Sequence, residues 1–203
     1  MSAIALPHDA KAGPTKPEVR SVVLGKLALE STDHFVDVGS CTGAVTIEAA
    51  RYSGRVTAIE RKEDRLAVTE QNLAANEDEV TADVDLVNEA APAGIPADAD
   101  AIFLGGSRNF EAVLDRAVEL GIDRIVMNVS RLEVAGDAVE AFRDRDLLEE
   151  VVQLQVSHGY ELAGATSFNS ENPVYMLVGS ATSAVTETGD GETDTDSAAE
   201  DSQ

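Results

Sequence analysis

Residues 35–46 read FVDVGSCTGAVT, in which an apolar strand ends in a loop of small residues and a helix begins at once. Backbone N–H groups in such a loop are not shielded by large side chains, and they lie at a helix N-terminus, so they can hold the polar groups of a ligand closely. A second apolar run at 56–59 ends on Glu60, which lies 21 residues after Gly39. At about this spacing an acidic residue reaches ribose hydroxyls in a doubly wound α/β fold, so the two segments predict a nucleotide-binding site.

The glycine pattern narrows the choice of nucleotide. A dinucleotide loop has the pattern G-x-G-x-x-G, whereas this loop has Gly39 and Gly43 with Cys41 between them, and Ala44 stands where the last glycine would be. Asp37 followed by G-x-(small)-x-G resembles the first motif of the class I S-adenosylmethionine (SAM)-dependent methyltransferases. This resemblance implies that Asp37 orients the loop and the methionine end of SAM. The family usually has glycine where Cys41 stands, and because cysteine is small we expect the loop to keep its shape.

Composition predicts one domain and a tail. The last 21 residues, 183–203, contain seven acidic residues and no lysine or arginine, so we expect a disordered acidic tail after a single domain at 1–182. The chain has no long apolar run and no signal peptide, which predicts a cytoplasmic protein that does not enter a membrane. With Cys41 as the single cysteine, neither a disulfide framework nor a cysteine-based metal site is expected, and we assign no metal.

The charge balance is strongly acidic, with 38 Asp and Glu against 15 Lys and Arg and a net charge of −23. Nucleic-acid binding needs a concentrated basic surface, so we expect no nucleic-acid partner. An excess of acids with few lysines is also typical of proteins that stay soluble in concentrated salt, where repulsion is screened within a few ångströms. We therefore interpret the acidity as a halophilic adaptation.

Apolar runs typical of strands alternate with segments typical of helices along the chain. Thr15 and Glu18 have the spacing of a capping box, so we expect a helix to begin with Thr15 as its N-cap. Two alternating runs near the end have no helix between them and predict an antiparallel pair at the edge of the sheet. We expect helices from 15, after 43, and at 63–76, 110–119 and 132–142, and strands at 35–38, 56–60, 83–87, 100–104, 124–128, 147–158 and 172–180.

This order predicts the doubly wound, Rossmann-like α/β fold of a class I SAM-dependent methyltransferase, with a mostly parallel seven-stranded sheet and a reversed strand at one edge. Further motifs resemble a narrower family, the decarboxylating cobalt-precorrin methyltransferases of cobalamin biosynthesis, also called precorrin-6B methylases. The resemblance covers residues 3–180. Its motifs lie at 13–20 (GPTKPEVR), 37–43 with 45–48, 91–92, 105–107 (GGS), 124–128 with 132–133, and 172–175 (NPVY).

The resemblance implies two groups of site residues. Ala90 stands where the family often has an acid near the adenine, and basic side chains are expected to receive a substrate with many carboxylates. We assign no catalytic side chain, because the ring of the substrate can itself act as the carbon nucleophile. The predicted SAM-binding residues are Thr15, Asp37, Gly39, Ser40, Cys41, Thr42, Gly43, Glu60, Ala90 and Ala91. The predicted substrate-binding residues are Lys16, Gly105, Gly106, Ser107, Arg108 and Arg131.

The function implied by the resemblance is SAM-dependent C-methylation of a cobalt-precorrin, coupled to decarboxylation of an acetate side chain. The implied partners are a polycarboxylate macrocycle and further copies of the chain in a homotetramer. Two alternatives stay open: a related methyltransferase acting on tRNA or on protein carboxyl groups, and a non-catalytic SAM-binding subunit. His158, before Gly159, is a candidate proton shuttle, although a lone histidine is more often structural.

Overall fold

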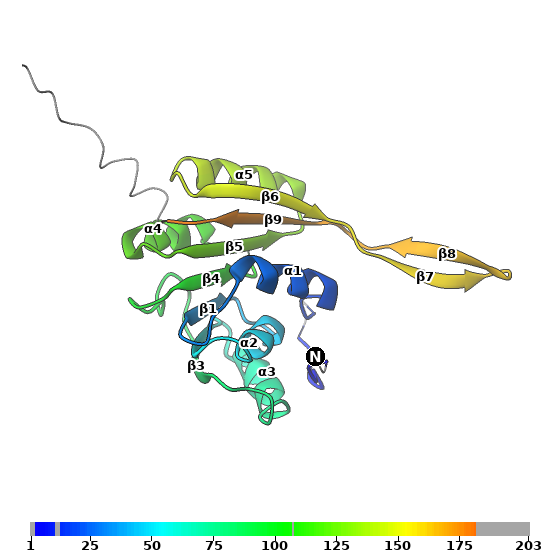
Figure 1. Ribbon diagram of the computed structural model, residues 1–203, viewed down its shortest axis with the longest axis horizontal. Coiled ribbons are helices and arrows are strands. Elements are labelled where there is room, and N and C mark those ends of the chain that lie inside the picture. The colour runs from blue at the N-terminus through cyan, green and yellow to red at the C-terminus, as the bar shows by residue number, and fades with distance from the viewer. Residues whose placement is uncertain (1–2, 11–12, 107, 182–203) are drawn as a thin grey trace, which may run out of the picture.

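The computed structural model describes residues 3–10, 13–106 and 108–181, so the predicted tail at 183–203 lies outside the described residues. Its centre is a seven-stranded sheet in the order β3-β2-β1-β4-β5-β9-β6, in which every strand except β9 runs parallel to the others (Figure 1). The fold predicted from the sequence is confirmed. The strands are β1 (His34–Val38), β2 (Arg55–Ile59), β3 (Asp83–Val87), β4 (Ala101–Leu104), β5 (Arg124–Val129), β6 (Leu148–Leu154) and β9 (Val174–Gly179).

Helices pack on both faces of this sheet because successive strand side chains point to opposite sides. On β1, Phe35 joins a core cluster with the apolar residues of α1 and α2, whereas Val36 and Val38 join a second cluster with those of α4 and α5. Both clusters are closed to solvent at their centres, where Phe35 and Val36 have no exposed surface. The helices are α1 (Pro17–Leu27), α2 (Ala44–Ala49), α3 (Glu63–Ala74), α4 (Phe110–Leu120) and α5 (Leu132–Arg143).

The first helix begins one residue later than predicted. Its N-cap is Lys16, in an extended conformation with φ −62° and ψ 146°, and no side chain caps the helix. Thr15 is therefore not the N-cap, and the capping-box prediction was wrong. The reason is Pro17, which disfavours helical angles in the residue before it and takes the first helical position itself. The carbonyl oxygen of Thr15 instead accepts a hydrogen bond of 2.6 Å from the guanidinium of Arg20.

The predicted antiparallel pair near the end of the chain is present. Strand β9 pairs with β6 and with β5 and is antiparallel to both, so the reversed strand lies one position in from the edge, which β6 forms. Within the described ranges, no helix combines the length and the apolar character that crossing a bilayer requires.

Between β6 and β9 the chain forms a two-stranded arm that the sequence analysis missed. Strands β7 (Ser157–Leu162) and β8 (Ala165–Ser170) pair around a two-residue turn, Ala163 and Gly164, with φ values of 51° and 79°. The arm projects away from the body of the protein (Figure 1). The predicted strand at 147–158 is thus interrupted where the chain leaves the sheet. Ala at the first turn position is unusual for this turn type, which favours Asn, Asp or Gly, so the turn had only a weak signature.

Candidate functional site

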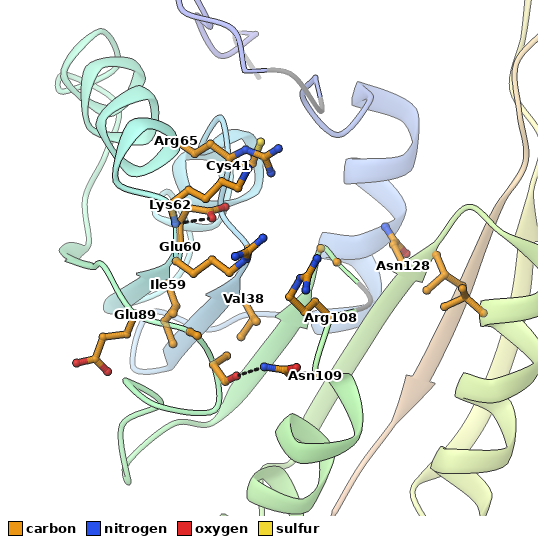
Figure 2. A pocket seen from close by; sticks show the side chains of 18 of the residues that line it. Val38, Cys41, Ile59, Glu60, Lys62, Arg65, Glu89, Arg108, Asn109 and Asn128 are labelled. Carbon is orange, nitrogen blue, oxygen red and sulfur yellow. Dashed lines mark hydrogen bonds between the residues drawn. The ribbon is translucent and has the colours of Figure 1, made fainter.

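Two adjoining cavities open where the carboxyl ends of β1, β4 and β5 meet. The first has a volume of about 630 Å³ and the second about 460 Å³. Their linings share Gly39 and Cys41 after β1, Gly105 after β4, and 128–130 at the end of β5. Figure 2 shows the first cavity, with Glu60 on one side and Asn128 on the other. Ligands of open α/β sheets bind at this edge, so the cavities are the candidate site.

The structure brings together nearly all of the residues predicted from sequence. Gly43 lines neither cavity, because it packs against Thr69, and Ser107 lies outside the described residues. The first cavity is lined by Gly39, Cys41, Glu60, Ala90, Ala91, Gly105, Gly106, Arg108 and Arg131. The second is lined by Thr15, Lys16, Asp37, Gly39, Ser40, Cys41, Thr42 and Gly105.

The glycine loop is held in shape by helix α3. The hydroxyl of Thr69 donates to the carbonyl of Cys41 at 3.1 Å, and the side-chain amide of Asn72 donates to the carbonyl of Thr42 at 2.9 Å. A Cβ on Gly43 would lie 2.9 Å from Cγ2 of Thr69, closer than real Cβ contacts, so glycine is required there. The loop also has a left-handed backbone at Cys41, with φ 55°. This conformation explains why a related loop would carry glycine at the position of Cys41.

Replacing Cys41 by glycine should therefore relieve backbone strain. We expect Cys41→Gly to raise the free energy of unfolding by about 1 kcal/mol relative to Cys41→Ala, which keeps the Cβ. Affinity for SAM should be kept or improved, because the loop conformation does not change. Denaturant unfolding in concentrated salt and calorimetric titration with SAM measure the two effects. Loss of SAM binding in Cys41→Gly would show that the thiol itself contacts the ligand.

Asp37 is a buried carboxylate at the end of β1, with only 1% of its surface exposed. Burial raises the pKa of Asp37 to about 6, and the nearby charge of Glu60 also raises it. The hydroxyl of Thr46 donates a hydrogen bond of 2.6 Å to the carboxylate, which lowers the pKa but does not offset the effect of burial. Among the described residues, no lysine, arginine or histidine forms an ion pair with this carboxylate. Asp37 lines the second cavity, where the positively charged amino group of a ligand would supply the missing counter-charge.

This shift predicts a pH dependence of stability. Asp37 binds its proton more tightly in the folded protein than in the unfolded chain. Its protonation therefore contributes fully to the free energy of unfolding below pH 3.8, and this contribution is lost as the pH rises through about 6. In Asp37→Asn this loss is absent. We expect the free energy of unfolding of the variant, minus that of the wild type, to increase by about 2.4 kcal/mol between pH 4 and pH 7 in the ligand-free protein. A difference that does not change with pH would contradict the assignment.

Glu60 follows β2 and is 5% exposed. Its Oε1 accepts a hydrogen bond of 3.0 Å from the backbone N–H of Lys62, and its own carbonyl accepts one of 2.8 Å from the side-chain amide of Asn88. These contacts fix the residue beside the glycine loop, with the carboxylate on the wall of the first cavity (Figure 2). A buried carboxylate held in this way can accept hydrogen bonds from the two hydroxyls of a ribose.

We expect Glu60→Ala to weaken SAM binding by about 1.5–3 kcal/mol, the range for a hydrogen bond to a charged group. Glu63→Ala is the matched control, because Glu63 is an exposed acid in the first turn of α3 that lines neither cavity. Isothermal titration calorimetry with SAM compares the two variants. Equal affinities would remove Glu60 from the nucleotide site.

The wall opposite Glu60 is open. Gly105 and Gly106 follow β4, and the backbone of Gly106 approaches to 3.9 Å from where a Cβ of Gly39 would lie. Oδ1 of Asn128 has no hydrogen-bond partner among the described residues, although the atom itself is buried. Asn128 therefore presents an unused polar group where the two cavities join.

The remaining sequence candidates lie elsewhere or have partners. Lys16 reaches the second cavity but is ion-paired with Glu171. His158 is on the exposed arm, where its Nε2 lies 3.7 Å from Oε1 of Glu171, and it lines neither cavity. This position gives no support to the proton-shuttle hypothesis. In the part of the chain described, no cluster of three or more His, Cys, Asp or Glu side chains could hold a metal ion.

Comparison with known proteins identifies the family. The model of the precorrin methyltransferase domain matches residues 6–180. The chain belongs to the precorrin methyltransferase family. It is 74% identical over 181 residues to the probable cobalt-precorrin-6B C(15)-methyltransferase (decarboxylating) of Halobacterium salinarum, covering 89% of this chain and 96% of the relative. The protein of the same name from Methanosarcina acetivorans is 39% identical over 171 residues, covering 82% and 93%.

Solved structures agree with this assignment. The precorrin 8w decarboxylase of Methanobacterium thermoautotrophicum matches with a TM-score of 0.76 and 30% identity, covering 85% of this chain and 95% of that one. A tRNA (m1A58) methyltransferase from Aquifex aeolicus matches with a TM-score of 0.71, covering 88% and 74%, but its 17% identity shows a shared fold alone. The family resemblance predicted from the sequence motifs is confirmed.

This precorrin methyltransferase also has site residues that the sequence analysis missed. They are the basic residues on and just before the first turn of α3, together with Asn109. The amide of Asn109 donates to the carbonyl of Ala91 at 3.4 Å and so joins two walls of the first cavity. A signal was present, because Arg61, Lys62 and Arg65 follow Glu60 within five residues in a chain that has few bases.

Proposed function

We propose that this precorrin methyltransferase is a SAM-dependent cobalt-precorrin-6B C(15)-methyltransferase that also decarboxylates its substrate. The observation that carries the proposal is the pairing of a cofactor-type loop, between buried Asp37 and Glu60, with an open wall of glycines after β4. The name of the Halobacterium salinarum relative, which is 74% identical, supports the same reaction.

The buried carboxylates fit SAM at its two ends. Glu60 would accept hydrogen bonds from the ribose hydroxyls in the first cavity, and Asp37 would face the ammonium group of the methionine part in the second. Ala90 and Ala91 leave room for the adenine beside Glu60. Bound in this way, SAM supplies an electrophilic methyl group where the two cavities join.

The protein contributes mainly by aligning the macrocycle with the methyl group of SAM. The glycines at 105–106 leave room for a macrocycle at the junction of the cavities, and Arg108 and Arg131 flank that space. Because the conjugated ring provides the carbon nucleophile, holding its reacting carbon in line with the methyl group accounts for the rate acceleration without a nucleophilic side chain. Loss of CO₂ breaks the bond between the carboxylate and its methylene carbon. The electron pair passes into the ring system, and the carbon later takes a proton.

The proposal is tested by incubating the protein with SAM and cobalt-precorrin-6B in concentrated salt. We expect S-adenosylhomocysteine, CO₂ and a singly methylated, decarboxylated product in equal amounts. Methylation of tRNA or of protein carboxyl groups, with no reaction on the precorrin, would replace this function by one of the alternatives. SAM binding without turnover of any of these substrates would favour a non-catalytic subunit.

Arg108 and Arg131 provide a test of substrate binding. Each Arg→Ala change should lower kcat/KM for the cobalt-precorrin by about tenfold to a hundredfold, the equivalent of one charge-assisted hydrogen bond. SAM affinity should not change, because neither residue belongs to the glycine loop or contacts Glu60. Full activity in both variants would contradict the roles proposed for these arginines.

We also propose that the protein is a homo-oligomer, a tetramer by its family resemblance, and that the arm takes part in assembly. Tyr160, Leu162 and Phe168 on the arm are 47%, 56% and 67% exposed, and an isolated two-stranded ribbon is only marginally stable in water. Phe168→Asp should lower the mass measured by light scattering in concentrated salt. An unchanged mass would exclude this side chain from the interface.

We further propose a cellular compartment and a domain organisation for the protein. We place the protein in the cytoplasm, in concentrated salt, as a single domain at 1–182 followed by an acidic tail at 183–203 that catalysis does not need. The net charge of −23 and the Halobacterium salinarum relative support the adaptation to salt.

A further inference from the structure

The cations of this protein fall into two groups. Of the 15 Lys and Arg residues, 14 lie in the described part of the chain. Eight of these form ion pairs with carboxylates: Lys16, Arg20, Lys26, Arg51, Arg55, Arg116, Arg124 and Arg145. Six have no ion pair among the described residues, and five of those six line the first cavity: Arg61, Lys62, Arg65, Arg108 and Arg131.

This division matters because carboxylates outnumber cations by 38 to 15, so a cation readily finds an acidic neighbour. The lining of the first cavity contains only two acids, Glu60 and Glu89. Glu60 is turned to the backbone N–H of Lys62, and Glu89 points away from the cations (Figure 2). The cavity is therefore a local positive field in a strongly negative protein.

The five cations come from two walls. Arg61, Lys62 and Arg65 lie at the start of α3, and Figure 2 shows the side chains of Lys62 and Arg65 extending together on one side of the cavity. Arg108, between β4 and α4, and Arg131, the N-cap of α5, belong to the other side. Arg65 is half-buried, and the other four side chains are exposed to the solvent of the cavity.

The cofactor does not account for these charges. SAM carries a sulfonium and an ammonium group against a single carboxylate, so its net charge is positive and a positive wall would repel it. The ligand that matches the wall is an anion with several charges placed widely enough to reach both sides. A macrocycle with carboxylates around its rim has this form, and each carboxylate pairs well with a guanidinium or an ammonium group.

We propose that Lys62 and Arg65 form a second carboxylate-binding wall that faces Arg108 and Arg131, so that the macrocycle is held by its rim from both sides. This proposal rests on the proposed function and assigns residues that the sequence motifs do not contain. Lys62 and Arg65 act as positioning residues. They fix the ring against the cavity, and they do not touch the reacting carbon.

The test uses Lys62→Gln/Arg65→Gln in the full chain, with Arg143→Gln as the matched control. Arg143 is the sixth cation without an ion pair, but it is exposed at the end of α5 and lines neither cavity. Binding is followed by fluorescence titration in 2 M KCl, in the presence of S-adenosylhomocysteine. The probes are a porphyrin octacarboxylate and a porphyrin tetracarboxylate, two ligands with the same ring and different numbers of rim charges.

We expect the double variant to bind the octacarboxylate about tenfold to a hundredfold more weakly and to lose most of its preference over the tetracarboxylate. SAM affinity should stay within about twofold, and Arg143→Gln should match the wild type in every titration. With cobalt-precorrin-6B, KM should rise while kcat changes little, because the lost contacts act on binding rather than on the reacting carbon. The single variant Arg65→Lys, in which Lys62 is unchanged, should bind the octacarboxylate more tightly than the double variant does.

Two results would overturn the proposal. Unchanged octacarboxylate affinity and unchanged KM in the double variant would show that this wall does not receive the substrate. An equal loss of SAM and porphyrin binding would assign the cations to the cofactor. Failure of the proposed function would look different, because it would be seen in the wild type. A wild-type protein that binds SAM and does not methylate the precorrin would contradict that function.

Discussion

The parallel pairing of β1 with β2 on one side and β4 on the other is the constraint on which the site depends. Val38, the last residue of β1, is in register with Ile59 of β2 and with Leu104 of β4. The next residue of each strand therefore leaves the sheet at the same level. Gly39, Glu60 and Gly105 are these residues, and Leu104 is in turn in register with Met127, which precedes Asn128. The pairing thus brings three loops and the last residues of β5 from distant parts of the sequence to one edge.

The half of the candidate site that we propose to bind the cofactor could be predicted from sequence because its signals are local. An apolar strand that ends on an acid and a small-residue loop fixes its own geometry over about ten residues, and Asp37 and Glu60 lie where this geometry puts them. The left-handed angle at Cys41 and the close approach of Thr69 to Gly43 explain why glycine recurs in such loops. The mostly parallel sheet could be predicted from the alternation of its strands with helices along the chain.

The half that we propose to bind the substrate could not be predicted with the same completeness, because it depends on which charged side chains form ion pairs elsewhere in the fold. Lys16 was predicted to bind substrate in the same way as Arg108, yet it pairs with Glu171, which is 155 residues away in the sequence. A chain with 38 acids offers too many partners for sequence to choose among them. The two-stranded arm was missed for a different reason. Its turn has Ala163 at a position that favours Asn, Asp or Gly, and its strands continue the alternation of apolar and polar residues in β6 and β9.

The unpaired cations have a further consequence in concentrated salt. In molar chloride salt each of these cations would be surrounded by chloride, and the Debye length is only about 3 Å, so a single carboxylate would gain little by replacing the ion. A rigid ligand that meets several cations at once binds its second and later groups intramolecularly, and it releases one chloride for each. Under the proposed function, the number of carboxylates on the rim of a ligand would then decide which molecules the cavity retains. The salt that screens the repulsion between the acidic side chains of the protein would also weaken the binding of small metabolites with one or two carboxylates.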